Sequence, residues 1–265
     1  MNAPARPILR SSVLTAGTGT PVLMLHGSVS SGAMWTPVIN VLKSRFRVLA
    51  PDLIGYGRTD AWPPELEFGL EDEVRLIEPL VGNEPAHVVA HSYGGVVALQ
   101  LARAGRVPLR SLTLIEPVEF HVLRASDDRE AWVEVHGFGE RYLARIAAGD
   151  TETALREFVD FWSGAGAWDA MDELGRAQMR RAAGTLAFDF RATFADPGPD
   201  PWSHIRLPVR LLTGDRSPFP VRRIAAILTE RLPSATLQVV AGADHFLPTT
   251  HHDLLGGLLL EKLSN

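Results

Sequence analysis

The chain has 265 residues, 46% of them hydrophobic, so it can bury a sizeable core and is long enough for one domain with an insertion. Its formal net charge is −5 at pH 7 without a block of like charges, which argues against binding to nucleic acid or an anionic membrane surface. Cysteine is absent, which excludes disulfides, thiolate metal sites and cysteine nucleophiles. Without a leader-like start or a run of about 18 apolar residues, we expect a soluble, cytoplasmic protein.

Short apolar runs alternate with segments of helical length along most of the chain. The runs lie at 22–25, 47–50, 88–90, 112–115, 209–212 and 237–240, and the candidate helices at about 33–44, 70–81, 94–104, 218–231 and 249–262. This alternation predicts an α/β fold with a doubly wound, mainly parallel sheet covered on both faces. Ligands bind beyond the carboxyl ends of such strands, so functional residues should follow the apolar runs.

Ser92 lies between the apolar run at 86–90 and the helix-like segment at 94–104. A strand that turns directly into a helix forces the residue at the bend into a sparsely populated backbone conformation, which only small neighbours permit. Ala90 and Gly94 supply such neighbours. Taken alone, the pattern also fits a tight turn with a serine of no function. In the functional interpretation, the Ser92 hydroxyl is a nucleophile raised at the mouth of the sheet.

A nucleophilic serine needs a base, and His245 is the best placed of the nine histidines because it follows the last apolar run. His26 is expected to be held in a turn, and the side chain of His91 should point away from the nucleophile. His251 and His252 open the last helix, where we expect exposure to solvent. No carboxylate or thiolate pattern accompanies them, so we expect neither a metal nor another cofactor.

An oxyanion needs two N–H donors held where negative charge develops. We assign one to the amide of Tyr93, which follows the nucleophile at the start of a helix. The other is assigned to Ser28, in a glycine- and serine-rich segment at 25–32 that leaves the first central strand. Such a segment often serves only as a connection. For Trp35, core packing is the favoured role and the floor of a substrate pocket is the alternative.

The alternation breaks between Ile115 and Pro208, where helical patches occur without a convincing strand. We therefore expect two core segments, 1–117 and 203–265, separated by a helical insertion at 118–202. Residues 119–202 hold 12 of the chain's 20 aromatic residues, most of which should pack within the insertion. A minority is expected to line an apolar pocket above the nucleophile. The pocket candidates, in addition to Trp35, are Trp132, Tyr142, Trp162 and Phe246.

Taken together, these motifs resemble those of the α/β-hydrolase family. They are His26-Gly27, the segment 51–58 that is similar to Asp-x-x-Gly-x-Gly-x-Ser, the bend around Ser92, and the Gly-x-x-His at 242–245. They follow the family's order and spacing from about residue 20 to 262. The resemblance implies a Ser-His-acid triad and a helical cap after the sixth strand. Ala90 replaces a commoner glycine and Thr59 a commoner serine.

The acid has two candidates. Family members usually place it three residues past a glycine after the seventh strand, but that slot holds Ser217 here. Asp215 lies two residues earlier and could serve if its loop bends. Glu116 directly follows the apolar run at 112–115, and members similar to haloalkane dehalogenases or the coelenterazine luciferase have a glutamate there. We favour Glu116 over Asp215.

These residues predict a serine hydrolase that cleaves a carboxylic ester of a small, apolar substrate through an acyl-enzyme. A serine nucleophile excludes the aspartate-based chemistry of dehalogenases and epoxide hydrolases that share the fold. Cleavage of a carbon–carbon bond, a lactone or a thioester is an alternative, as are perhydrolysis and a cofactor-free lyase reaction. A different class is a ligand sensor that turns over slowly. The expected partner is a small-molecule substrate.

Overall fold

The apolar runs form the strands of one seven-stranded sheet in the computed structural model, which describes residues 6–198 and 201–264. The strands are β1 (Val13–Ala16), β2 (Thr20–Leu25), β3 (Phe46–Pro51), β4 (Ala86–His91), β5 (Leu109–Ile115), β6 (Val209–Gly214) and β7 (Ala235–Val240), and their order across the sheet is β1-β3-β2-β4-β5-β6-β7. All neighbours are parallel except β1 and β3. The predicted α/β class with a doubly wound, mainly parallel sheet is confirmed.

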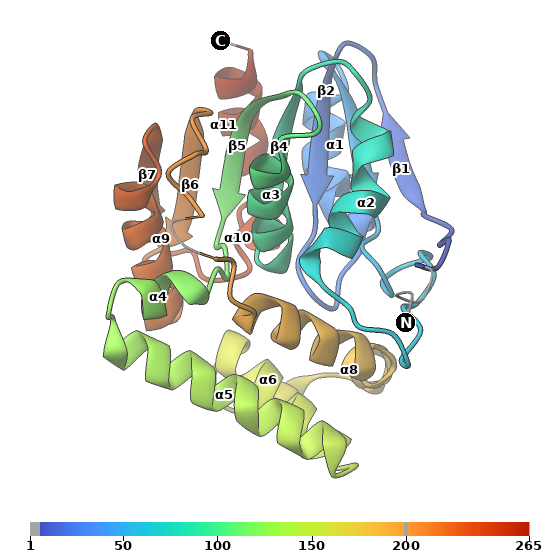
Figure 1. Cartoon of the computed structure of the whole chain (residues 1–265), viewed down its shortest axis with the longest axis vertical. Helices are drawn as coiled ribbons and strands as arrows, with labels where there is room; N and C mark the ends of the chain where they lie inside the picture. The colour runs from blue at the N-terminus through green and yellow to red at the C-terminus, as the bar shows by residue number, and fades with distance from the viewer. Residues whose placement is uncertain (1–5, 199–200, 265) are drawn as a thin grey trace.

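The helices of the core cover both faces of this sheet. On one face lie α2 (Leu70–Val81), α3 (Tyr93–Ala104) and α9 (Phe219–Arg231), and on the other α1 (Thr36–Leu42) and α11 (His252–Leu263). Figure 1 shows α2 and α3 in front of the sheet and α1 and α11 behind it. The central strands are therefore buried on both sides, which explains why their sequences are apolar runs rather than alternating patterns.

Two predicted helices are each divided into two elements. The segment predicted at 33–44 is a short 3-10 helix, η1 (Gly32–Trp35), followed by α1, and the segment predicted at 249–262 is α10 (Leu247–Thr250) followed by α11. No described helix is long and apolar enough to cross a bilayer.

Between β5 and β6 the chain forms a helical insertion made of α4 (His121–Ala125), α5 (Arg129–Ala147), α6 (Thr151–Ser163), α7 (Ala167–Ala170) and α8 (Glu173–Phe194). Figure 1 shows α5, α6 and α8 beyond the edge of the sheet from which the chain leaves β5. Aromatic rings fill its centre: Phe138 is stacked on Phe161 with 4.3 Å between ring centroids, and Tyr142 is tilted against Phe190 with 5.0 Å between centroids. The boundaries at 118 and 202 stay a prediction.

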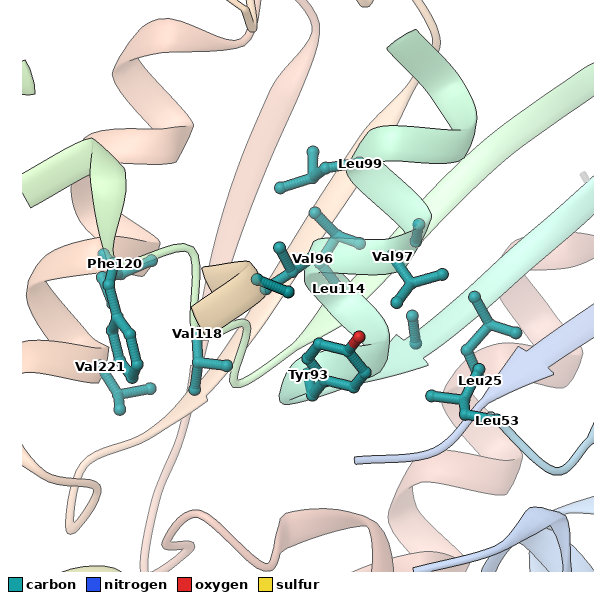
Figure 2. Packing of buried hydrophobic residues seen from close by; sticks show 14 of the residues in the cluster. Leu25, Leu53, Tyr93, Val96, Val97, Leu99, Leu114, Val118, Phe120 and Val221 are labelled. Atoms are coloured by element: carbon teal, nitrogen blue, oxygen red, sulfur yellow. The ribbon is translucent and has the colours of Figure 1, made fainter. Parts of the chain in front are cut away.

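The insertion and the sheet share one continuous apolar core. Figure 2 shows Val96 of α3 beside Leu114 of β5, and Phe120, just before α4, beside Val221 of α9. These side chains are buried, so the start of the insertion is anchored to the same core that holds α3. The carboxyl ends of β4 and β5 are thereby kept in a fixed position facing the insertion.

Candidate active site

Ser92 occupies a sharp bend between β4, which ends at His91, and α3, which begins at Tyr93. Its backbone has φ 53° and ψ −121°, a conformation that a residue with a side chain rarely adopts. A methyl group on Gly94 would come within 2.5 Å of the carbonyl oxygen of His26, so only glycine fits there. The bend therefore depends on close contact between the start of α3 and the end of β2, and it places Ser92 at the carboxyl edge of the sheet.

A chain of contacts links Ser92 to a histidine and a carboxylate from distant parts of the sequence. The Ser92 Oγ lies 3.0 Å from His245 Nε2, and His245 Nδ1 lies 3.4 Å from Glu116 Oε2. With the ring proton on Nδ1, the imidazole donates to the carboxylate and accepts the serine hydroxyl proton at Nε2. All three side chains are buried.

Glu116 is held in place by groups other than the histidine. Its Oε1 accepts hydrogen bonds from the Gly214 amide at 2.6 Å and the Ser217 hydroxyl at 2.8 Å. Its backbone has φ 53°, in the left-handed region that a residue with a side chain rarely adopts. Ser217 fills the slot where the resemblance implied an acid, and its hydroxyl binds Glu116 instead.

The structure does not bring Asp215 to His245. The Asp215 side chain is exposed, and its Oδ1 accepts a hydrogen bond from the Gly242 amide at 2.8 Å. The backbone amide of Asp215 is bound to the carbonyl of Val240 at 3.2 Å, which ties the end of β6 to the end of β7. Asp215 therefore braces two loops, and of the two candidate acids only Glu116 contacts the imidazole.

His245 has two further neighbours, one at its ring and one at its backbone. Trp162 of α6 stacks on it with 4.1 Å between ring centroids, so the helical insertion contributes directly to the site. At the backbone, His91 Nε2 lies 2.8 Å from the carbonyl oxygen of His245. Burial lowers the pKa of His91 to about 3, so this ring is neutral and donates its Nε2 proton to that carbonyl. This contact joins residues 154 positions apart, so no local pattern around His91 indicates it.

The two predicted oxyanion donors both line the cavity beside Ser92. Tyr93 is the first residue of α3, so its N–H has no acceptor within the helix. Ser28 follows Gly27, where an added methyl group would come within 2.9 Å of the Ser92 Cβ. The turn is fixed by His26, whose Nε2 accepts from the Leu53 amide at 2.9 Å and whose Nδ1 lies 2.7 Å from the Gly27 carbonyl oxygen.

A cavity of about 280 Å³ lies between Ser92 and the helical insertion. Its walls are mostly apolar, and the aromatic residues among them are Tyr93, Phe120, Phe158, Trp162, Phe190 and Phe246. Trp162 and Phe246 were predicted to line a pocket, and the structure places both there. An apolar chamber of this size above a reactive side chain is the usual form of a small-molecule site.

The other three predicted pocket residues do not line this cavity. Trp35 is fully buried in the core between the sheet, α1 and α11. Trp132 packs on His136, one turn along α5, with 4.8 Å between ring centroids. Tyr142 is buried inside the insertion, where its hydroxyl donates to the Ala183 carbonyl at 3.0 Å. For Trp35 the favoured role, core packing, is confirmed. The pocket predictions for Trp132 and Tyr142 are wrong, because the side of each helix that faces the cavity depends on how the helices cross.

Several cavity residues were missed, and one of them carries a carboxyl group. On α8, Leu186, Asp189, Phe190 and Thr193 all line the cavity at a spacing of three and four residues. That spacing is visible in the sequence and could have identified this face of the helix. Asp189 is buried, and the Ser28 hydroxyl donates to its Oδ2 at 2.5 Å.

His251 and His252 do not converge with His245. His251 Nδ1 lies 2.9 Å from Thr250 Oγ1, and His252 Nδ1 lies 3.1 Å from Asp253 Oδ1. Among residues 6–198 and 201–264, no group of three or more histidine, aspartate or glutamate side chains is arranged to hold a metal ion.

Comparison with known proteins identifies relatives over almost the whole chain. A model of the alpha/beta hydrolase family matches residues 22–255. RutD of Azorhizobium caulinodans, whose name refers to carbamate hydrolysis, is 27% identical over 92% of this chain and 91% of its own length. A pimeloyl-[acyl-carrier protein] methyl ester esterase of Aeromonas hydrophila is 31% identical over 56% of each chain. The carboxylesterase CesB of Bacillus subtilis has a similar fold, with a TM-score of 0.66 at 18% identity over 96% of this chain and 87% of its own.

Proposed function

Because the chain belongs to the alpha/beta hydrolase family, we propose that it is a serine hydrolase that cleaves a carboxylic ester of a small, mainly apolar substrate. The observation that carries the proposal is the contact of Ser92 Oγ with His245 Nε2 at 3.0 Å, with Glu116 on the other ring nitrogen. Nucleophile, base and orienting acid are the minimum set for covalent acyl transfer. The cavity above Ser92 is the proposed substrate site.

In the first half of the reaction, His245 Nε2 takes the hydroxyl proton as Ser92 Oγ attacks the carbonyl carbon. The negative charge that develops on the carbonyl oxygen is stabilised by the amides of Tyr93 and Ser28. The Glu116 carboxylate, which contacts His245 Nδ1, stabilises the imidazolium that forms. When the tetrahedral intermediate collapses, the carbon–oxygen bond to the leaving group breaks and His245 returns the proton to the alcohol.

In the second half, water attacks the acyl-enzyme. His245 takes a proton from the water, and the same two amides stabilise the second oxyanion. Collapse of this intermediate breaks the bond to Ser92 Oγ, which recovers its proton from His245. The products are a carboxylic acid and an alcohol, and the protein returns to its starting state.

Carbamate cleavage is a second candidate, favoured by the similarity to RutD over nearly the full length of both chains. A carbamate is attacked at a carbonyl carbon like an ester, so the same residues would serve. A comparison of p-nitrophenyl butanoate with a carbamate of the same size would establish which substrate class has the higher kcat/KM.

Ser92→Ala should give a folded protein that has lost ester hydrolysis, with kcat reduced by about 10⁶-fold. The physical reason is that no other group in the site is positioned to form the covalent bond. Hydrolysis of p-nitrophenyl butanoate measures the loss, and circular dichroism checks the fold. Ser163→Ala, at another serine that lines the cavity, is the matched control and should retain turnover. Equal rates for Ser92→Ala and the parent protein would refute the proposal, and turnover far below one per second on every ester would favour a ligand sensor.

A further inference from the structure

The cavity contains one buried carboxylate that the proposed reaction does not use. Asp189 of α8 lies on the cavity wall and is only 3% exposed. Its Oδ2 accepts hydrogen bonds from the Ser28 hydroxyl at 2.5 Å and the Tyr56 hydroxyl at 2.6 Å. Its Oδ1 is buried and has no hydrogen-bond partner among the described residues. A buried carboxylate oxygen without a hydrogen-bond partner costs free energy, so the presence of Asp189 at this position calls for an explanation.

The cavity lining that the structure describes gives this carboxylate no permanently charged positive partner. Neither lysine nor arginine is among the described residues that line the cavity. A second buried carboxyl, that of Glu73 in α2, lies nearby. Burial raises the pKa of Glu73, and repulsion by Asp189 raises it further. Both partners on Asp189 Oδ2 are neutral hydroxyls. This part of the cavity wall therefore carries an acidic group that no lysine or arginine of the described lining neutralises.

Aromatic rings form much of the remaining wall. Phe158, Trp162 and Phe190 line the same cavity, and the rings of Phe158 and Trp162 stand edge to face with centroids 6.3 Å apart. The face of an aromatic ring carries negative charge density that attracts a cation. A buried carboxylate among aromatic rings is a combination that suits an ammonium group better than a neutral hydrocarbon.

We propose that Asp189 is a specificity-determining residue that binds an ammonium group on the substrate. The inference rests on the proposed ester hydrolysis and narrows it to amine-bearing esters. Ser28 is one of the two proposed oxyanion donors, so the Asp189 carboxylate lies within one side-chain length of the reacting carbonyl. The ammonium group should accordingly be separated from the ester carbonyl by a short chain.

The test compares two esters of matched shape, p-nitrophenyl β-alaninate and p-nitrophenyl butanoate. The β-alaninate has an ammonium group where the butanoate has its terminal methyl group. The parent protein should favour the β-alaninate by roughly tenfold in kcat/KM, and Asp189→Asn should abolish that preference while still hydrolysing the butanoate. A parent protein that favours the butanoate, or an Asp189→Asn variant that keeps the ammonium preference, would overturn the inference and leave ester hydrolysis standing.

Two control variants separate recognition from structural support. Glu119→Gln removes a carboxyl that is also buried but does not line the cavity, and it should keep the preference. Tyr56→Phe removes one hydroxyl that holds Asp189 and leaves the carboxylate, so it should lower the melting temperature and keep the preference. If Asp189 only tied α8 to the sheet, its replacement would slow both esters by the same factor.

The pH dependence provides an independent readout. Burial raises the pKa of Asp189 to about 7, so its ionised fraction, and with it the preference for the β-alaninate, should increase from pH 6 to 7.5. Burial raises the pKa of Glu73 to about 8, and the pKa values of Tyr56, Tyr93 and Tyr142 are raised above their ordinary value, so these neighbours stay largely protonated in that range. His245 acts on both esters equally and cancels in the ratio.

Binding to the Ser92→Ala variant tests the inference without turnover. Calorimetric titration should show that n-butylammonium binds more tightly than n-butanol, and that Asp189→Asn in the same background removes the difference. If no ester is hydrolysed but the ammonium ion still binds through Asp189, the proposed function fails and the binding site stands. Equal affinity for the two probes would refute the site whatever the hydrolysis assays show.

Discussion

At the scale of single residues, Glu116 shows how hydrogen bonds offset the free-energy cost of burying a carboxylate. Its carboxylate is fully buried and accepts hydrogen bonds from the Gly214 amide, the Ser217 hydroxyl and the His245 ring. Hydrogen bonds from several directions replace the water that the group has lost. The same bonds hold the carboxylate in the one position from which it can orient the imidazole.

Glu116→Gln and Asp215→Asn should therefore have very different effects. Glu116→Gln keeps the shape of the side chain and removes the charge that stabilises the imidazolium, so we expect kcat to fall by about 10³–10⁴-fold. Asp215→Asn should stay within a few-fold of the parent because Asp215 lies on an exposed loop and does not contact His245. Steady-state hydrolysis of p-nitrophenyl butanoate provides the measurement. A larger loss in Asp215→Asn than in Glu116→Gln would assign the acid to Asp215.

At the scale of elements, the site depends on how tightly β4 and α3 meet. Gly94 lies against the backbone carbonyls of Leu25 and His26, at 2.7 and 2.5 Å from the position of an added methyl group. Backbone atoms of a central strand cannot move aside as a flexible side chain can. Glycine at this position is therefore required by packing of the helix on the sheet, independently of any chemistry at Ser92.

Gly94→Ala should lower the free energy of unfolding by about 1–3 kcal/mol, because the methyl group forces α3 away from β2. Gly184→Ala is the matched control, since Gly184 lies on an exposed part of α8 with open space around it. Removing a glycine from a helix should stabilise the protein by roughly 0.5–1 kcal/mol there. Urea denaturation of both variants measures the two changes. A Gly94→Ala variant as stable as the parent would show that the close approach is not needed.

At the scale of the whole molecule, the site is assembled from segments that lie far apart in the sequence. Ser92 and His245 are 153 positions apart and meet because β4 and the loop after β7 end at the same edge of the sheet. The contact between Ser92 and His245 could be predicted because local sequence patterns mark the ends of strands and do not depend on packing. The apolar runs and the order of the motifs identified the core strands, Ser92 and His245, whereas the acid was left open between Glu116, which was favoured, and Asp215.

Other parts could not be predicted because they depend on packing between elements. β1 was not predicted, since it is a four-residue edge strand whose side chains are half-buried or exposed. Trp132 and Tyr142 were placed at the pocket although Trp132 packs on His136 and Tyr142 is buried inside the insertion. Asp189 was overlooked because a single carboxylate between two phenylalanines gives no sign of burial until α8 is positioned over the cavity.

The most direct test of the central claim is covalent labelling with a fluorophosphonate, located by peptide mass spectrometry. The probe forms a phosphorus–oxygen bond only with a serine that a nearby base activates, and fluoride leaves. We predict one adduct, on Ser92, formed about a thousandfold more slowly in His245→Ala. Ser28, Ser30 and Ser163 also line the cavity and should stay unmodified. Labelling at another serine, or an unchanged rate in His245→Ala, would contradict the account.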